Sequence, residues 1–280
     1  MNVSYLLVSL VTTKSAKEKG LLIRGMAIID DDLFVVTQRS SEVEVFNCKS
    51  LVSSRQWILE GLLRPADIGS SKTNRCLYIM DWKDGSMKKE VFCVDTSGKL
   101  LHSWKTGDDY GDIISVSNEN NVLVTCFGKN EFNEYSPQGE MIRKISLQGA
   151  EYPTHAVKLS NGEFMVSAGD SSHLLHRVCI VDALGKVEKS FGEEKGSSWT
   201  QLNHPMHLAV FKDGSVAVLD NGNQRVLLLD KDLQFNRILL SNKIHGLQNP
   251  TRLLLNESNN LLFVADIHKG AGEIRVFHLT

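Results

Sequence analysis

The fold is decided by the stretch Val218-Leu219-Asp220-Asn221-Gly222-Asn223-Gln224-Arg225-Val226. In it, an apolar run ends at Asp220, a polar turn rich in Asn and Gly follows, and a second apolar run begins at Val226. Upstream, Pro205-Met206-His207-Leu208 opens an earlier apolar run, which ends in the turn Lys212-Asp213-Gly214-Ser215. Short apolar runs separated by Asn, Asp and Gly are typical of antiparallel strands joined by tight turns. With a last run at residues 233–240, this part of the chain predicts a unit of four strands.

The opening phrase of this unit recurs along the chain. Four of the five prolines begin it, in Pro65-Ala66-Asp67-Ile68, Pro153-Thr154-His155-Ala156, Pro205-Met206-His207-Leu208 and Pro250-Thr251-Arg252-Leu253. Two further copies lack the proline: Arg24-Gly25-Met26-Ala27 and Gly111-Asp112-Ile113-Ile114. Four antiparallel strands repeated every 40 to 50 residues or so are typical of a propeller blade. The sequence therefore predicts an all-β, six-bladed β-propeller with four antiparallel strands per blade.

We expect residues 1–280 to form this single domain. The predicted blades cover residues 24–60, 62–107, 109–148, 151–192, 202–241 and 247–280. The last unit contains only three strand patterns, and one unpaired strand pattern precedes the first unit, at residues 5–12. Each would leave backbone groups unsatisfied alone, so we expect the N-terminal strand to complete the sixth blade.

The fifth unit resembles an NHL repeat. The resemblance rests on Ser190-Phe191-Gly192, on Leu202-Asn203-His204-Pro205 and on the stretch from Val218 to Val226. The first three units share the layout of this repeat more than its individual residues. The resemblance implies a structural role for Asp220, Asn223 and Arg225, which would brace the turn of the blade.

Composition and charge narrow the classes of partner and compartment. Lysine plus arginine (31) nearly balance aspartate plus glutamate (33), so no global positive field is available for DNA or for a broad RNA surface. The number of cysteines is odd, and Cys93, Cys126 and Cys179 lie in apolar runs, which favours reduced thiols. The apolar run at residues 5–11 lacks the flanks of a signal peptide. We expect a cytoplasmic protein that does not contact a membrane.

Loops that join the blades, and those that join second to third strands, should share one face of the ring, which we call the variable-loop face. Tight hairpins should share the opposite face, the hairpin face. Binding residues concentrate on varied loops held by a rigid scaffold. The side chains expected to contact a partner on the variable-loop face are Trp82, Lys83, Lys88, Lys89, Tyr110, Tyr152, Arg177, Trp199 and Arg252.

Three further polar residues follow the opening proline by two positions and are expected at the mouth of the channel: Asp67, His155 and His207. One interpretation is that they bind the backbone of nearby loops. The other is a metal site, since amidating lyases of similar architecture bind metal near the channel through histidines. No HxxH or HxH spacing supports the second interpretation, so we expect neither metal nor cofactor.

The resulting functional hypothesis is a non-catalytic recognition module that binds a protein or peptide. NHL propellers commonly form the substrate-recognition part of tripartite-motif-like ubiquitin ligases. Two alternatives stay open: an NHL domain that binds single-stranded RNA, and a metal-dependent propeller lyase or lactonase. No phosphate-binding loop, nucleophile elbow or paired metal-binding cysteines occur, so the sequence contains no positive signal for catalysis.

Overall fold

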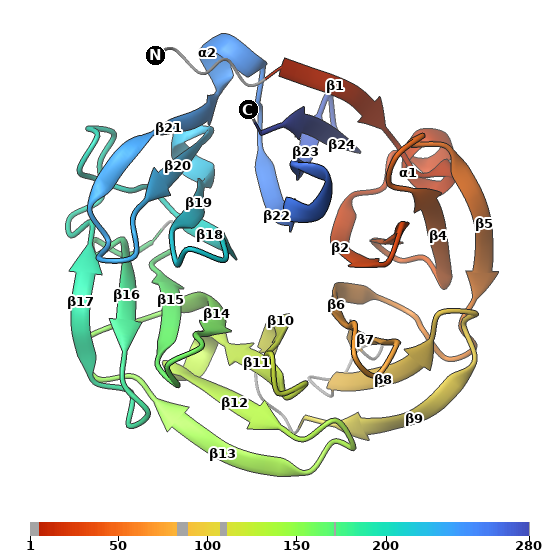
Figure 1. The fold of residues 1–280 in the computed structure, drawn as a ribbon, viewed down its shortest axis with the longest axis horizontal. Coiled ribbons are helices and arrows are strands. Elements are labelled where there is room, and N and C mark those ends of the chain that lie inside the picture. Colours follow the sequence, from red (N-terminus) through yellow and green to blue (C-terminus); the bar gives the residue numbers. More distant parts are fainter. Residues whose placement is uncertain (1–5, 83–88, 107–110, 171, 280) are drawn as a thin grey trace.

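The strands form six separate antiparallel sheets of four strands each, arranged as blades around a central axis (Figure 1). The computed structural model describes residues 6–82, 89–106, 111–170 and 172–279. In five of the blades the strands are hydrogen-bonded in chain order from the channel outward, and in the sixth the order is β22, β23, β24 and then β1. The prediction of an all-β, six-bladed propeller with four strands per blade is confirmed.

The blades have the following strands. Blade 1 contains β2 (Ile23–Ile29), β3 (Asp32–Thr37), β4 (Glu42–Asn47) and β5 (Ser53–Ile58). Blade 2 contains β6 (Pro65–Ser71), β7 (Cys76–Trp82), β8 (Lys89–Asp95) and β9 (Leu100–Lys105). Blade 3 contains β10 (Gly111–Val116), β11 (Val122–Cys126), β12 (Glu131–Tyr135) and β13 (Met141–Ser146). Blade 4 contains β14 (Pro153–Lys158), β15 (Phe164–Ala168), β16 (Arg177–Val181) and β17 (Val187–Phe191).

Blade 5 contains β18 (Pro205–Val210), β19 (Val216–Asp220), β20 (Arg225–Leu229) and β21 (Phe235–Ser241). Blade 6 contains β22 (Pro250–Asn256), β23 (Leu261–His268), β24 (Ala271–His278) and β1 (Leu6–Val11). Two short helices, α1 (Lys14–Lys19) and α2 (Asn242–His245), lie outside the sheets.

Strand β1 closes the ring by pairing antiparallel with β24, in register from Leu6 opposite His278 to Val11 opposite Ile274. The predicted completion of the sixth blade by the N-terminal strand is therefore confirmed. Helix α1 follows directly and was not expected from the sequence. It begins after Thr13, whose hydroxyl accepts a hydrogen bond from the Ala16 amide at 3.0 Å.

The hydrophobic core lies between the blades. One cluster joins Phe34 of blade 1 to Ile79 of blade 2, and another joins Leu33 of blade 1 to Phe263 of blade 6. Each sheet is therefore buried on both faces by its neighbours, as expected for a ring of blades. The five cysteines are buried and form no disulfide. In the part of the chain that the structure describes, no helix has the length and apolar character needed to cross a membrane.

Candidate functional site

The inner strands all carry the same irregularity near their first residues. Each of the six has a register shift between its first and third residue, so that the second residue has no direct partner on the neighbouring strand. The third residues form a ring of six positions, which we call the channel ring: Gly25, Asp67, Ile113, His155, His207 and Arg252.

The structure corrects the alignment of blade 1, where the sequence phrase placed Met26 opposite Asp67. The strand register places Gly25 there, because β2 begins at Ile23 and Ile23 pairs with the last residue of β3. A Cβ atom on Gly25 would lie 2.6 Å from both Oδ1 of Asp67 and the amide nitrogen of Ile68. The missing side chain therefore gives the Asp67 carboxylate its space.

Arg252 and Asp67 form a buried ion pair across the channel, with 3.4 Å between Nε and Oδ1. Only 4% of Arg252 and 2% of Asp67 is exposed. The other carboxylate oxygen accepts the amide of Ile114 at 3.0 Å, and Arg252 donates to the carbonyls of Thr251 (2.9 Å) and Ala66 (3.2 Å). Burial raises the pKa of Asp67, while Arg252 acts to lower it.

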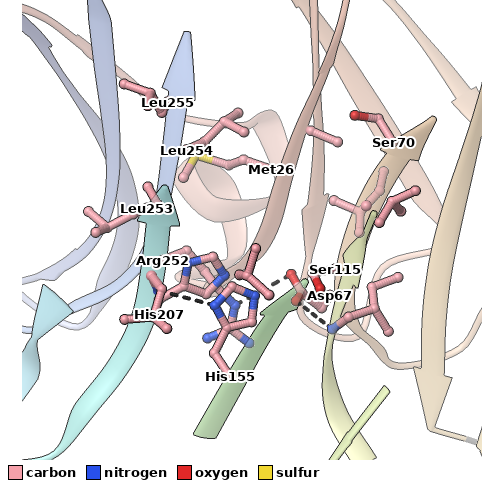
Figure 2. A pocket seen from close by; sticks show the side chains of 18 of the residues that line it. Met26, Asp67, Ser70, Ser115, His155, His207, Arg252, Leu253, Leu254 and Leu255 are labelled. Atoms are coloured by element: carbon pink, nitrogen blue, oxygen red, sulfur yellow. Dashed lines mark hydrogen bonds and ion pairs between the residues drawn. The ribbon is translucent and has the colours of Figure 1, made fainter. Parts of the chain in front are cut away.

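His155 and His207 stack face to face, with ring centroids 3.9 Å apart (Figure 2). Nδ1 of His155 accepts the amide of Leu208 at 3.1 Å, so the neutral ring carries its proton on Nε2. Nδ1 of His207 is buried and has no hydrogen-bond partner among the described residues. Burial, assisted by the charge of Arg252, lowers the pKa of His155 to about 3. Burial and the neighbouring His155 lower the pKa of His207 well below its ordinary value.

These two histidines predict a pH-dependent stability. In the unfolded chain each imidazole binds a proton below about pH 6.5, whereas in the folded chain both stay neutral. The free energy of unfolding should therefore be highest above pH 6.5 and fall as the pH is lowered from there toward 3, with up to about 1.4 kcal/mol lost per pH unit for each histidine. Urea unfolding at pH 7.5, 6.5 and 5.5 measures this slope. His207→Phe should make it shallower, and an unchanged slope in that variant would contradict the assignment.

Cavities lie on both sides of the channel ring. A cavity of about 230 Å³ lies on its hairpin side, bounded by the polar ring residues at one end and by Leu253, Leu254 and Leu255 farther along (Figure 2). It shares Val116, Val157 and Val210 with a wider cavity of about 760 Å³, which is lined by residues of the hairpin turns. A third cavity, of about 110 Å³ and next to Ile113 and Met206, lies on the other side of the ring. The channel is thus accessible through the hairpin face, where the sequence predicts tight hairpins and no binding site.

The contacts of Asp67, His155 and His207 do not support the metal interpretation of these residues. Within the described parts of the chain, no group of three or more His, Cys, Asp or Glu side chains is placed to hold a metal ion. Nδ1 of His155 is already engaged by a backbone amide, and the carboxylate of Asp67 faces Arg252. The guanidinium would repel a cation in this position.

The aromatic residues predicted on the variable-loop face have different surroundings. Trp199 is 61% exposed and contacts Phe235, with ring centroids 5.6 Å apart. Trp82 is 36% exposed, and the ammonium of Lys89 lies 4.6 Å from its ring centroid. Tyr152 is half-buried and stacks on His173. Trp199 thus presents the largest free aromatic surface of the three.

Two of the five cationic residues predicted for partner contact are buried. Lys89 is only 4% exposed, and its ammonium lies over the ring of Trp82. Arg252 belongs to the channel ring and is buried in its ion pair, so it does not lie on the loop surface. Arg177 is half-buried at the start of β16. Lys83, Lys88 and Tyr110 lie outside the described residues.

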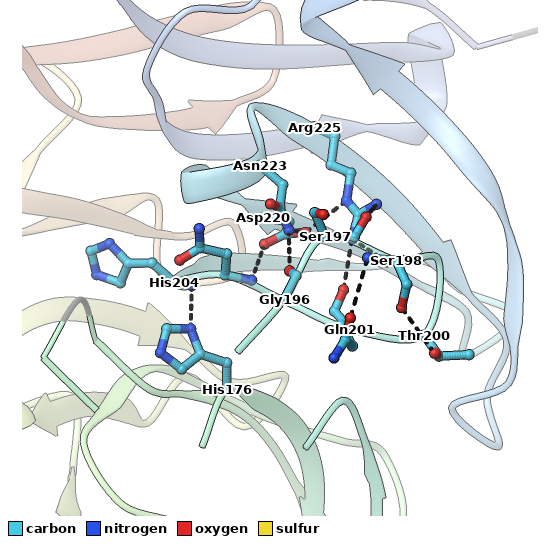
Figure 3. Close-up of polar contacts among 11 residues, drawn as sticks. His176, Gly196, Ser197, Ser198, Thr200, Gln201, His204, Asp220, Asn223 and Arg225 are labelled. Carbon is cyan, nitrogen blue, oxygen red and sulfur yellow. Dashed lines mark hydrogen bonds and ion pairs between the residues drawn. The ribbon is translucent and has the colours of Figure 1, made fainter. Parts of the chain in front are cut away.

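The bracing role predicted for Asp220, Asn223 and Arg225 is confirmed (Figure 3). Asp220 is fully buried and accepts hydrogen bonds from the amide of Asn203 (2.7 Å), the side chain of Asn223 (2.8 Å) and Nε of Arg225 (2.7 Å). The other guanidinium nitrogens donate to three backbone carbonyls of the loop that precedes β18, those of Ser197, Ser198 and Gln201. This loop is therefore fixed from within the blade.

The same aspartate recurs where sequence reasoning did not identify it. Asp81 and Asp266 lie in second strands opposite the opening proline, as Asp220 does, and each accepts the backbone amides just before the proline of its own blade. In blade 6, Arg275 adds an ion pair to Asp266 at 3.0 Å. The signal in the sequence is an aspartate that follows an apolar run 15 or 16 positions after the opening proline.

His176 links two loops of the variable-loop face. Its Nε2 donates to the carbonyl of His173 at 2.9 Å, and its Nδ1 accepts the amide of His204 at 2.6 Å. His245 likewise accepts the amide of Ser241 at 3.1 Å. These two histidines accept hydrogen bonds from loop backbone, the role that the first interpretation gave to the polar residues at the channel mouth.

The comparisons with known proteins support the fold and leave the family open. No family model matches the chain, so membership of the NHL family stays a prediction. The β-propeller domain of Cps50 (Swd1) from Myceliophteria thermophila is similar, with a TM-score of 0.66 and 13% identity, over 99% of this chain and 100% of that one. Virginiamycin B lyase from Staphylococcus aureus has a TM-score of 0.67 and 9% identity, with coverage of 99% and 100%. The chain has the architecture of a six-bladed β-propeller.

One curated relative is similar in sequence: the probable tubulin polyglutamylase TTLL9 of Rattus norvegicus, 26% identical over 202 residues. The match covers 67% of this chain and 42% of the relative, so the chain spans less than half of that protein's length.

Proposed function

We propose that this propeller is a protein-recognition module whose binding surface is the variable-loop face. The observation that carries the proposal is the exposure of three large apolar side chains in the connections of blades 4 to 6, two of them in loops and one in α2. Leu174 is 79% exposed, Trp199 61% and Ile244 78%. Large apolar side chains on loops that a rigid scaffold holds in place are typical of protein-binding surfaces.

These loops are ordered before any partner binds. Arg225 holds the carbonyl of Ser198 at 2.9 Å and that of Gln201 at 2.6 Å, on either side of Trp199. The amide of Lys195 donates to the carbonyl of Leu174 at 2.7 Å. A surface that is fixed in advance loses little conformational entropy on binding, and this supports recognition by a preformed face.

Tubulin is the first partner to test, because the rat relative is named for an activity on tubulin. The NHL resemblance supports a second role for the same surface, as the substrate-recognition part of a tripartite-motif-like ubiquitin ligase. Both roles need a protein partner on the variable-loop face, and the same variants test them.

Replacing the most exposed aromatic residue should weaken the interaction. We expect Trp199→Ala to lower affinity at least about tenfold, equivalent to about 1.4 kcal/mol, because a truncated aromatic anchor loses its buried contact area. Asp213→Ala, on the hairpin face, is the matched control and should bind like the wild type. Titrations with purified tubulin, and with proteins captured from cell extract by the wild-type propeller, give the dissociation constants.

Two outcomes would contradict the proposal. One is equal binding by Trp199→Ala and the wild type together with a loss in Asp213→Ala, which would place the partner on the hairpin face. The other is tight binding of single-stranded RNA that falls steeply with salt, which indicates a phosphate-dominated interface.

A further inference from the structure

The hairpin-side cavity ends at polar groups whose hydrogen-bonding capacity the described residues do not exhaust. Arg252 carries five N–H groups, and its contacts within the described chain are to Asp67, Thr251 and Ala66. His155 presents Nε2–H, because its other nitrogen accepts a backbone amide. His207 adds a buried Nδ1 without a partner among the described residues. A buried polar atom left in this state costs about 1–3 kcal/mol, which a ligand in the cavity would recover.

The walls of the same cavity offer little polarity beyond this end. Val116, Val157, Val210 and the leucines of β22 line it. Its serine hydroxyls are already used as donors, Ser70 to the carbonyl of Ile28 at 3.0 Å and Ser115 to that of Ala156 at 2.6 Å. A ligand that fits must therefore have one small polar head and an apolar tail.

The charges at the closed end limit the head group. Asp67 on β6 and Arg252 on β22 compensate each other, and His155 on β14 and His207 on β18 are neutral. The remaining ring positions on β2 and β10 are uncharged. A bare anion would leave a net negative charge in the buried channel, whereas an acid that arrives with its proton would not.

We propose that the central channel binds a small carboxylic acid with an apolar tail, which enters from the hairpin face. The carbonyl oxygen of its head accepts from Arg252 and from Nε2 of His155, and its proton is shared with Nδ1 of His207. The tail lies along the valines at the cavity's open end. This site is separate from the protein-binding surface, on the opposite side of the channel ring.

Hexanoate is the probe. Its binding to the whole chain is measured by calorimetry or by ligand-observed NMR. Since an acid ionised in solution takes up one proton on binding, affinity should rise about tenfold for each unit by which the pH falls between 8 and 6.5. Hexanol, which has the same tail without the carboxyl group, should bind at least tenfold more weakly. Equal binding of hexanol, affinity independent of pH, or no binding of millimolar hexanoate would each overturn the proposal.

Two variants test the position of the ligand. His207→Phe keeps the stacked ring but removes its nitrogens, so we expect at least tenfold weaker hexanoate binding with stability retained, because an unpartnered atom is lost. Val157→Phe fills the part of the cavity where the apolar tail of the ligand would lie, and it should abolish hexanoate binding. Hexanoate binding that survives both variants would overturn the site. Neither variant should alter partner binding through Trp199, so failure here and failure of the recognition proposal can be told apart.

The acid could be a free metabolite or the C-terminus of a peptide, and the shared chemistry is a carboxyl group beside an apolar side chain. A peptide that ends in leucine and binds more tightly than hexanoate, with binding lost on C-terminal amidation, would assign the site to a chain terminus. Tighter binding of the free acid would assign it to a small molecule.

Discussion

Deletion of residues 1–13 is expected to lower the free energy of unfolding by at least about 3 kcal/mol. The deletion removes all pairing between β1 and β24 and exposes an unprotected strand edge on blade 6. It also removes Val11, which is buried between blades 6 and 1, and Thr13, which caps α1. Urea unfolding followed by circular dichroism measures the change, and loss of solubility should accompany it.

Point substitutions in β1 provide the matched comparison. Val11→Asp places a charge without a partner where only 6% of the side chain is exposed, and it should reproduce much of the loss. Leu10→Ala changes a side chain that is 55% exposed and should cost no more than about 0.5 kcal/mol. A truncated chain that unfolds at the wild-type urea midpoint would show that β1 does not contribute to the ring.

Asp220→Ala is the single substitution with the largest expected effect, about 3–5 kcal/mol. It removes the acceptor of three hydrogen bonds and leaves the guanidinium of Arg225, only 7% exposed, without its counter-charge. Loss of the acceptor also frees the amide of Asn203, so the loop before β18 should loosen. Urea unfolding gives the free energy, and proteolysis of residues 193–204 reports on the loop.

The control for this substitution is Asp213→Ala in the exposed hairpin turn, which should cost less than about 1 kcal/mol. Asp220→Leu combined with Arg225→Met should be less destabilising than Asp220→Ala alone, since no buried charge is left unpaired. A double variant as unstable as the sum of its single changes would contradict the ion-pair explanation.

The architecture could be predicted because the sequence features that mark its strands and turns are local. The opening prolines mark the first residues of β6, β14, β18 and β22, and turn residues separate the apolar runs. Blade 1 lacks the proline, and there the phrase was aligned one residue too late, with Met26 in place of Gly25. Ring closure followed from the count of strands in the last blade.

The candidate sites were less predictable because burial depends on residues far apart in the chain. Arg252 was expected on a loop surface, yet it pairs with Asp67, 185 positions away. Lys89 was expected to contact a partner, yet it is buried beside Trp82. The equivalent positions of His155 and His207 in neighbouring blades are consistent with their stacking. No sequence pattern indicates the unpartnered nitrogen of His207 or the cavity beside it.

The pairing of β1 with β24 also sets an order of events during synthesis. Thr12 hydrogen-bonds to Gly272, 260 positions later, so the two halves of blade 6 leave the ribosome far apart in time. At about 5–20 residues per second, β1 waits on the order of ten seconds or more for its partner. Blades 1 to 5 can form pairwise from local contacts in that interval, while the ring stays open. A ribosome-bound chain therefore exposes the free edge of β1 until its last strand emerges, and this edge is where a chaperone or a second nascent chain would first find an unpaired strand.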